Sequence, residues 1–158
     1  MGFARAYREG DEYDLAPRLR QADLDELQAS CSLPPLQVLQ TGAYNSVPSV
    51  TVIGNNGFVA AMFGVVPQPD GTGVVWLLGS DELTKPPLSR QFIRECRTFV
   101  KVLERGYTEL HNIIDERNTV HRRWLEWIGF EFTNRIPEYG IERRPFLEFK
   151  KSCATQSQ

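Results

Sequence analysis

Short stretches of hydrophobic, often β-branched residues in the centre of the chain predict three β-strands. They cover residues 49–53, 58–66 and 74–78, and turn sequences separate them. The Asn-Asn-Gly sequence at 55–57 is typical of a tight hairpin, so we expect the first two strands to pair antiparallel. The third stretch is apolar on both faces, as in a strand that helices cover on each side.

Two later segments have apolar residues at helical spacing. The longer one carries Leu88, Phe92, Cys96, Phe99, Leu103 and Tyr107. This spacing predicts the longest helix of the chain, closed by Gly106. The shorter segment carries Val120, Trp124, Trp127 and Ile128 on one face. Asn118 or Thr119 is expected to cap its N-terminus and Gly129 its C-terminus.

The first forty residues combine a weak strand pattern with helical patterns. Residues 3–7 alternate weakly and predict a first strand. Leucines between 15 and 27 recur at helical spacing. Asp23 followed by Glu26 resembles a capping box, which favours two short helices over one long helix. Residues 36–39 follow two prolines and predict a short third helix.

Three more strands complete the pattern, at 110–114, 130–133 and 146–149, with a polar loop at 136–144. A helix between the fourth and fifth strands makes that pair parallel. We therefore predict an α+β fold: a mixed, mostly antiparallel seven-stranded sheet with helices on both faces. Residues 1–151 are expected to form a single domain, and residues 152–158 a frayed polar tail.

Composition and charge exclude several classes of protein. The chain has 158 residues, 41% hydrophobic and 24% charged, with a net charge of −2. This balance gives no electrostatic reason to expect nucleic acid or an anionic membrane as a partner. The three cysteines form no C-x-x-C and no metal-ligand spacing, and neither a secretory signal nor a membrane-spanning run is present. We expect a cytoplasmic protein with free thiols and no metal site.

The order of elements, with Asn118, a helix and Gly129-Phe130 directly after a buried strand, resembles the GNAT (GCN5-related N-acetyltransferase) family. The resemblance covers essentially the whole chain. It implies an acetyl-CoA site where the fourth and fifth strands separate, with the pyrophosphate at the N-terminus of the following helix. It also implies that Asn118 contacts the pantetheine arm. The alternative is that Asn118 only caps its helix.

The phosphate-binding motif of that family, Gln/Arg-x-x-Gly-x-Gly/Ala, is absent. The corresponding stretch, 79–90, has no Gly-x-Gly sequence. Asp81 and Glu82 place negative charge where phosphates are expected, and the two prolines at 86–87 lack the backbone N–H groups that hold anions. By resemblance and position, the candidate cofactor-binding residues are Leu77, Leu78, Gly79, Lys85, Ser89, Arg90 and Asn118.

The catalytic residues of the family are not preserved either. The tyrosine that acts as general acid corresponds to Leu125, which cannot donate a proton. Tyr107 and Tyr139 lie elsewhere in the sequence. Glu82 is a candidate general base, and backbone N–H groups near 77–79 are candidates to polarise the thioester carbonyl.

Other combinations of reactive residues are weaker candidates. A cysteine could be paired with His111 or His121 as a thiol–imidazole couple, but no spacing requires this. His121 is expected to face solvent on its helix. The tryptophans are expected in the core.

Within the GNAT fold, the chain resembles small GNAT-like proteins of short-tailed (podovirus) bacteriophages, among them an internal-virion assembly protein. The resemblance rests on Trp76, Ser80-Asp81-Glu82, the segment 88–92, Leu110, Asn112, Asn118, His121, Arg123, Leu125, Ile128-Gly129, Phe132, Gly140, Phe146 and Phe149. It implies a protein of the infected host cytoplasm, or of the virion, whose partners are virion or host proteins.

Three functions follow as hypotheses. The first is a phage protein with a degenerate acetyl-CoA site that acts in virion assembly or host interaction. The second is an active N-acetyltransferase that uses acetyl-CoA and an unknown amine. The third is a binding module that keeps acyl-CoA as a structural ligand.

Overall fold

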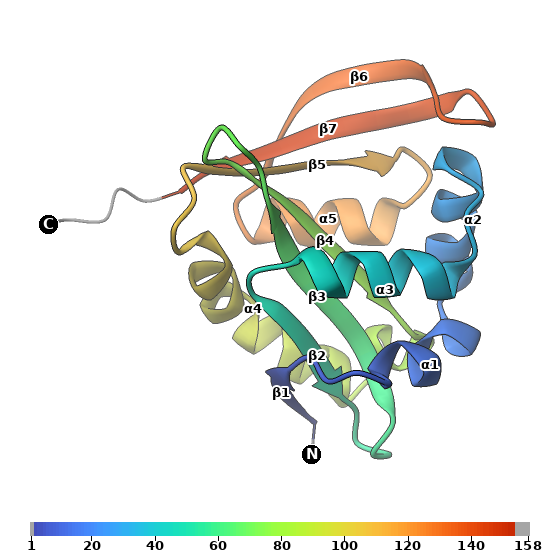
Figure 1. Ribbon diagram of the computed structural model, residues 1–158, viewed down its shortest axis with the longest axis vertical. Coiled ribbons are helices and arrows are strands. Elements are labelled where there is room, and N and C mark those ends of the chain that lie inside the picture. Colours follow the sequence, from blue (N-terminus) through green and yellow to red (C-terminus); the bar gives the residue numbers. More distant parts are fainter. Residues whose placement is uncertain (1, 154–158) are drawn as a thin grey trace, which may run out of the picture.

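The computed structural model describes residues 2–153, and it contains a seven-stranded sheet with helices on both faces (Figure 1). The strand order is β1-β2-β3-β4-β5-β7-β6. The strands are β1 (Phe3–Ala6), β2 (Ser49–Ile53), β3 (Val59–Pro67), β4 (Gly73–Gly79), β5 (Glu109–Asp115), β6 (Glu131–Tyr139) and β7 (Arg144–Ser152). The helices are α1 (Asp11–Leu15), α2 (Gln21–Ser30), α3 (Pro35–Asn45), α4 (Leu88–Glu104) and α5 (Thr119–Trp127), with short 3₁₀ turns η1 (Ala16–Arg18) and η2 (Asp81–Thr84). The predicted mixed sheet is confirmed, and β4 and β5 are parallel.

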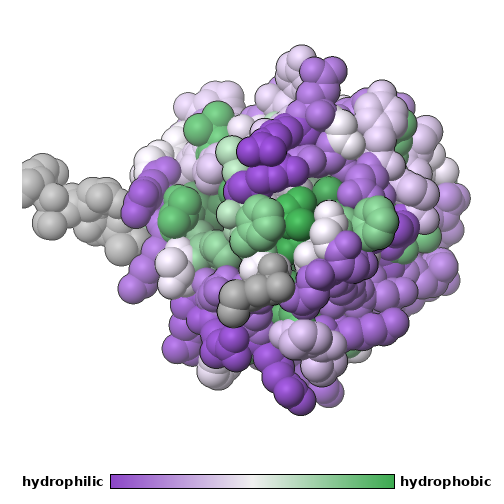
Figure 2. Space-filling model, turned by 90° about the horizontal axis from the view of Figure 1, so that it is seen from below, coloured by the Kyte–Doolittle hydropathy of each residue, from purple (hydrophilic) through white to green (hydrophobic). Residues whose placement is uncertain are grey.

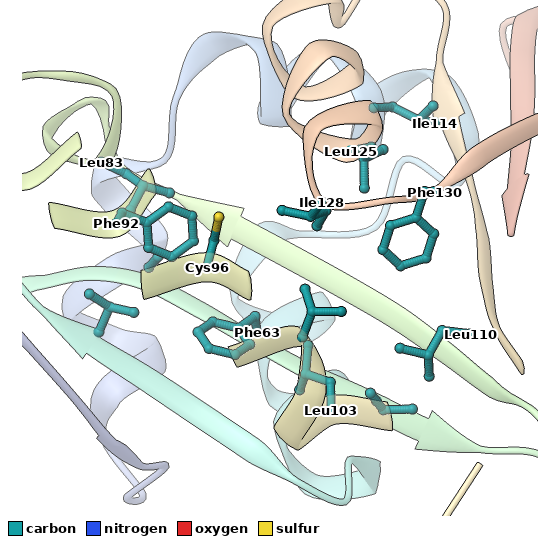
Figure 3. Close-up of a cluster of buried hydrophobic side chains, with 14 of the residues drawn as sticks. Phe63, Leu83, Phe92, Cys96, Leu103, Leu110, Ile114, Leu125, Ile128 and Phe130 are labelled. Atoms are coloured by element: carbon teal, nitrogen blue, oxygen red, sulfur yellow. The ribbon is translucent and has the colours of Figure 1, made fainter. Parts of the chain in front are cut away.

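Two apolar cores lie on opposite faces of the sheet, because successive side chains of a strand point to opposite sides. On one face, Met62 and Leu78 pack with α1, α2 and α3. On the other face, Phe63 packs with α4 and α5. Figure 3 shows this second core, with Leu125 of α5 and Ile128, directly after α5, beside Phe92 and Cys96 of α4.

The helix around 118–128 has the predicted boundaries. Asn118 occupies the N-cap position, although its side chain makes no capping hydrogen bond. Gly129 follows the helix with φ of 102°, a left-handed conformation that glycine adopts without the steric cost of a Cβ. Since Phe130 is buried directly afterwards, the turn delivers the chain back to the core.

Several predicted elements were wrong in extent. Helix α3, expected to be short and to begin at residues 36–39, has eleven residues. Strand β6 continues through residues predicted as loop and ends at Tyr139; it tolerates Pro137 because β6 is an edge strand. Strand β7 includes Ser152, the first residue of the predicted tail, and residues 154–158 of that tail lie outside the described part of the chain.

The predicted capping box was also wrong. Helix α2 begins after Arg20, so Asp23 and Glu26 lie within the helix, not at its start. Asp23 is 1% exposed and faces β4, while Glu26 faces β5. The two carboxylates therefore accept hydrogen bonds from strands of the sheet and do not cap their own helix.

None of the helices in the described part of the chain has the length and apolarity needed to cross a membrane. Figure 2 shows the face seen from below, where hydrophobic residues form a band among larger hydrophilic areas.

The parallel strands β4 and β5 pair over a short distance and then separate. Their register contains Gly73 opposite Leu110 and Val74 opposite His111. Beyond this point β4 slants away from β5 in Figure 1. The Asn112 side chain lies where they part: its Nδ2 donates to the Val75 carbonyl at 2.7 Å, and its Oδ1 accepts the Ile113 N–H at 2.7 Å.

The free edge of β4 is satisfied largely by α2. Gly79 donates its N–H to Asp23 Oδ2 at 2.9 Å and accepts the Arg20 N–H at 2.9 Å. A buried salt bridge of 2.8 Å joins the side chains of Arg20 and Asp23. Because backbone groups alternate along a strand, Leu77 also directs its N–H and C=O toward the gap, between the groups of Val75 and Gly79.

The free edge of β5 is satisfied in the same way. Asp115 donates its N–H to Glu26 Oε1 at 2.9 Å, across 89 positions of sequence. Helix α2 thus bridges the ends of both diverging strands and fixes the width of the gap.

We expect Asp23→Ala to lower the free energy of unfolding by about 3–5 kcal/mol, because it leaves Arg20 as an unpaired buried charge and Gly79 without its acceptor. Urea unfolding followed by tryptophan fluorescence measures this change. The matched control is Asp25→Ala on the same helix, whose carboxylate accepts an exposed hydrogen bond from Gln21; it should change stability by no more than about 0.5 kcal/mol. A loss below about 1 kcal/mol in Asp23→Ala would contradict the bridging role.

Candidate functional site

A cavity of about 330 Å³ occupies the gap between β4 and β5 and extends to both faces of the sheet. On the α2–α3 face its walls include Val38 and Trp76, and on the α4–α5 face they include Phe92 and Leu125. Leu77 of β4 and Ile113 of β5 line it at the level of the sheet. The cavity therefore passes through the sheet where the strands separate, and we call it the through-sheet cavity.

A second cavity, of about 510 Å³, lies between the N-terminal half of α4 and helix α5. Its lining includes Ser89 and Ile93 of α4 and Arg123 of α5. We call it the interhelix cavity. The two cavities share a wall made of Leu77, Phe92, His121 and Trp124. The rings of Phe92 and Trp124 are stacked within this wall, with centroids 5.5 Å apart.

Glu26 is the carboxylate that faces the through-sheet cavity among its described lining residues. Burial raises its pKa to about 7, and the nearby Asp23 and Asp115 carboxylates act in the same direction. The Asp115 N–H and the Asn118 amide oppose this shift by favouring the charged form. Glu26 therefore exchanges a proton near neutral pH, as a general base must.

The neighbouring carboxylates differ from Glu26 because each has an arginine partner. Asp23 pairs with Arg20. Burial would raise the pKa of Asp115, but hydrogen bonds from Arg117 outweigh burial and hold that pKa below its usual value. No such partner pairs with Glu26 among the salt bridges of the described residues, so its proton affinity stays high.

His121 lines both cavities, whereas the sequence predicted a solvent-facing side chain. Its ring packs against Trp124 with centroids 5.4 Å apart. Burial lowers its pKa to about 4, so the imidazole is neutral at pH 7. A neutral ring can hydrogen bond in the wall without adding charge.

The predicted cofactor-binding residues of β4 lie at the gap. Leu77 lines both cavities, and Leu78 lines the through-sheet cavity. Gly79 is at the end of the gap, but its backbone N–H and C=O are already bonded to α2. Leu77 is therefore the residue of the three whose backbone can meet an extended ligand.

Near the start of α4, the structure brings only one of the three predicted phosphate-binding residues to a cavity. Ser89 lines the interhelix cavity, while Lys85 and Arg90 are exposed and absent from the described linings of both cavities. The N–H groups of Lys85 and Ser89 donate to Glu82 and Lys85 carbonyls, and the prolines between them have none. The backbone at residues 85–87 and at Ser89 therefore has no N–H group available to a phosphate.

Asn118 is 4% exposed and lies beside Glu26. Its Nδ2 is buried without a well-formed hydrogen bond among the described residues, and the residue is outside the described lining of either cavity. The expected contact of Asn118 with a pantetheine arm stays a prediction.

Glu82, the candidate base from sequence, points elsewhere. Its Oε1 accepts the Asn55 N–H at 3.0 Å, at the β2–β3 turn, and it belongs to neither described cavity lining. Leu125, at the position of the general acid, is 3% exposed and packs in the core. The better-placed base is Glu26, which sequence reasoning missed because its pairing with Asp23 looked like a helix cap.

The other reactive candidates have structural surroundings. Cys96 is fully buried, burial raises its pKa, and its thiol contacts the Ile93 carbonyl at 3.1 Å. His111 contacts the Thr72 hydroxyl at 3.1 Å, where β4 and β5 still pair. The Tyr107 hydroxyl donates to the Val47 carbonyl. All three cysteines are free. No cluster of three metal-ligating side chains occurs within residues 2–153.

The site suits one part of acetyl-CoA and not the other. The gap offers Leu77 backbone groups to an extended amide-bearing chain such as pantetheine, and apolar walls to its methylene groups. The start of α4 offers prolines and acidic residues instead of a phosphate cradle. The pantetheine part fits these residues, and the pyrophosphate has only side chains such as Arg123 and Ser89 to meet it.

Comparisons with solved structures identify the fold. The chain is similar to an N-acetyltransferase from Staphylococcus aureus Mu50, with a TM-score of 0.71, 14% identity, and coverage of 98% of this chain and 99% of the other. It is similar to a spermidine N-acetyltransferase from Vibrio cholerae in complex with CoA and spermine (TM-score 0.69, 10% identity, coverage 96% and 95%). It is also similar to the ribosomal-protein-S18-alanine N-acetyltransferase from Escherichia coli (TM-score 0.67, 12% identity, coverage 100% and 97%).

These similarities show that the chain has the GNAT fold. No protein-family model matches the sequence, and no curated protein matches it. At 10–14% identity the solved structures establish the architecture, while activity has to be argued from the site.

The raised pKa of Glu26 predicts a distinct pH dependence of stability. The folded-state pKa, about 7, exceeds the ordinary value of 4.5, so the folded protein binds this proton more tightly than the unfolded chain. The resulting stability is complete below pH 4.5 and is lost as pH rises through about 7. His121 acts in the opposite direction, because its lowered pKa costs stability as pH falls from 6.5 toward 4.

The stability advantage of Glu26→Gln over the wild type should therefore be about 2–3 kcal/mol larger at pH 8 than at pH 5, since glutamine keeps the acceptor for Asp115 without the buried charge. Urea unfolding of both proteins at the two pH values measures the difference, and His121 cancels because both contain it. Equal differences at pH 5 and pH 8 would refute the assignment of Glu26 as the group that titrates.

Proposed function

We propose that this protein is an N-acetyltransferase that moves an acetyl group from acetyl-CoA to a primary amine in the through-sheet cavity, with Glu26 as general base. The observation that carries the proposal is that the gap between β4 and β5 is open through the sheet and contains a buried carboxylate with a pKa of about 7.

In this proposal the chain performs two tasks. When bound, acetyl-CoA supplies an activated thioester whose carbonyl carbon an amine can attack. Leu77 aligns the extended donor through its backbone groups, and Glu26 takes the proton that the amine must lose. A C–N bond forms, the C–S bond breaks, and the proton passes from Glu26 to solvent or to the released sulfur.

The leucine at 125 is compatible with this chemistry. A thiol has an ordinary pKa near 8.5, so sulfur is a good leaving group close to neutral pH even without a strong acid beside it. The loss of a tyrosine at this position lowers the rate without abolishing the route. In place of a phenol, Leu125 adds apolar packing between α5 and the sheet.

The residues available to the phosphates of acetyl-CoA imply that the donor binds weakly and that its binding depends on salt. Arg123 is exposed at the rim of the interhelix cavity, where water and ions screen its charge. Binding energy must therefore come mainly from the pantetheine part of the donor.

A second candidate function is the one implied by the likeness to phage proteins: a degenerate GNAT-fold protein that acts in virion assembly or host interaction. What favours it is the start of α4, where Pro86 and Pro87 remove backbone donors beside Asp81 and Glu82. Under this hypothesis the partners are virion or host proteins, and acetyl-CoA is not bound. A virion proteome without this protein, or normal titres from a phage that lacks it, would remove the assembly role.

Isothermal titration with acetyl-CoA, followed by thiol release over a panel of amines, tests the proposal. We expect measurable binding and turnover, with kcat/KM rising through an apparent pKa near 7. Glu26→Gln should lower kcat/KM by about 10²–10⁴-fold, remove the rise with pH, and leave the affinity for acetyl-CoA unchanged. Absence of binding at millimolar acetyl-CoA would exclude both the enzyme and an acyl-CoA-binding module.

The role of Arg123 in binding the phosphates of acetyl-CoA can be tested separately. Arg123→Gln should weaken acetyl-CoA binding by about two- to tenfold and leave S-acetylpantetheine binding unchanged, because the latter has no phosphates. Arg94→Gln is the matched control: Arg94 is exposed on α4 but is not in the described lining of either cavity. An equal loss for both ligands would show that Arg123 does not act on phosphate.

A further inference from the structure

The two ends of the through-sheet cavity differ in exposure. On the α4–α5 side its walls are core residues such as Cys96, Val100 and Leu103, each no more than 6% exposed. On the α2–α3 side the walls include Cys31 and Val38, which are half-buried, and Tyr139, which is 37% exposed. A second substrate therefore has its entrance on the α2–α3 side, opposite the interhelix cavity.

The walls at this entrance are aromatic and held in place. The Trp76 indole N–H donates to Ser46 Oγ at 2.7 Å, and its ring lies against Gly42, where an added Cβ would be 3.1 Å from the ring. Tyr139 packs on Phe146, with ring centroids 4.9 Å apart. The entrance is thus an apolar slot whose shape is set before a ligand arrives.

The charge of the cavity is as specific as its shape. Among its described lining residues Glu26 is the one acidic side chain, and no lysine or arginine is present. The wall histidine, His121, is neutral at pH 7. The cavity can therefore pair with one ammonium group, but it has no partner for a carboxylate or for a second ammonium group, and burying either unpaired is costly.

We infer that the acceptor of the proposed reaction is a small apolar primary monoamine, which enters between α2, α3 and the β6–β7 hairpin and places its nitrogen at Glu26. This inference rests on the proposed N-acetyltransferase function and adds the class of substrate. Amino acids and polyamines are excluded by the missing partners for their additional charges. A volume of about 330 Å³ suits an alkyl or benzyl group of modest size.

In the transfer, the ammonium ion loses one proton to the Glu26 carboxylate, and the free amine attacks the thioester carbonyl carbon. The new C–N bond replaces the C–S bond, and the sulfur leaves with the bonding electron pair. The amine nitrogen loses its remaining extra proton as the amide forms, and that proton neutralises the thiolate. No oxidant, reductant or further reactant is required.

Four probes that share a five-carbon chain test the inference. Pentylamine is the reference, norleucine adds a carboxylate to it, 1,5-diaminopentane adds a second ammonium group, and 1-pentanol has no charge. With acetyl-CoA at pH 8, we expect kcat/KM for pentylamine to exceed that for norleucine and for diaminopentane by about 100-fold. Without acetyl-CoA, calorimetry should show pentylamine binding about tenfold more tightly than pentanol, a preference that Glu26→Gln abolishes.

A variant that adds a charge partner tests the same inference from the opposite side. Val38→Asp places a carboxylate in the slot and should raise the use of diaminopentane relative to pentylamine by at least about tenfold. Thr41→Asp is the matched control, because Thr41 is exposed on the same helix and is not among the described lining residues. Retained acetyl-CoA binding in both variants verifies that they fold.

The outcomes separate the inference from the proposed function. Acetyl-CoA binding with equal or faster acetylation of norleucine or diaminopentane overturns the inference alone, as does equal binding of pentylamine and pentanol. Absence of both acetyl-CoA binding and thiol release overturns the proposed function and the inference with it. Preference for pentylamine in both assays supports the two together.

Discussion

The structure depends on one constraint: two adjacent strands separate in the middle of a sheet, and the backbone groups on their exposed edges still need hydrogen-bond partners. A buried N–H or C=O without a partner costs about 1–3 kcal/mol. Asn112 supplies a partner where the strands part. Further along, two carboxylates of α2 supply the others: Asp23 bonds to β4 and Glu26 bonds to β5. The position of α2, the width of the gap and the cavity through the sheet all follow from these few bonds.

The same bonds explain why a reactive group lies in the cavity. Backbone N–H groups on a buried edge are well satisfied by carboxylates, and the chain supplies two from adjacent turns of one helix. Asp23 has Arg20 as its partner, so its charge is neutralised. Glu26 accepts the Asp115 N–H and lies beside Asn118, but it has no described arginine partner, so burial dominates and its pKa rises to about 7. A residue that the sheet requires for its integrity thereby acquires the proton affinity of a general base.

The distance in sequence between bonded residues also explains which features could be predicted from the sequence. Periodicity and turn residues located the strands 49–53 and 74–78, the long helix α4, and the helix that Gly129 ends, because each depends on neighbours close in sequence. The extent of β6 was missed because Pro137 reads as loop unless the strand is known to lie at an edge. Glu26 was missed for a deeper reason: its partner, Asp115, is 89 positions away, and only the folded sheet brings them together.

His121 is a second residue whose surroundings could not be predicted from sequence. Beside Arg122 on a short helix it looked solvent-facing, yet the separation of β4 from β5 opens a space that its ring and Trp124 help to close. Burial lowers the pKa of this imidazole and Arg20 acts in the same direction, against the opposing effect of Asp23, so the ring stays neutral and adds no charge to the wall. The wall between the interhelix cavity and the through-sheet cavity thus contains a neutral histidine beside Leu77, Phe92 and Trp124. In the proposed reaction, prolines and acidic residues stand before α4 in place of a phosphate motif, so the donor has to gain its affinity mainly from the apolar space beside this wall.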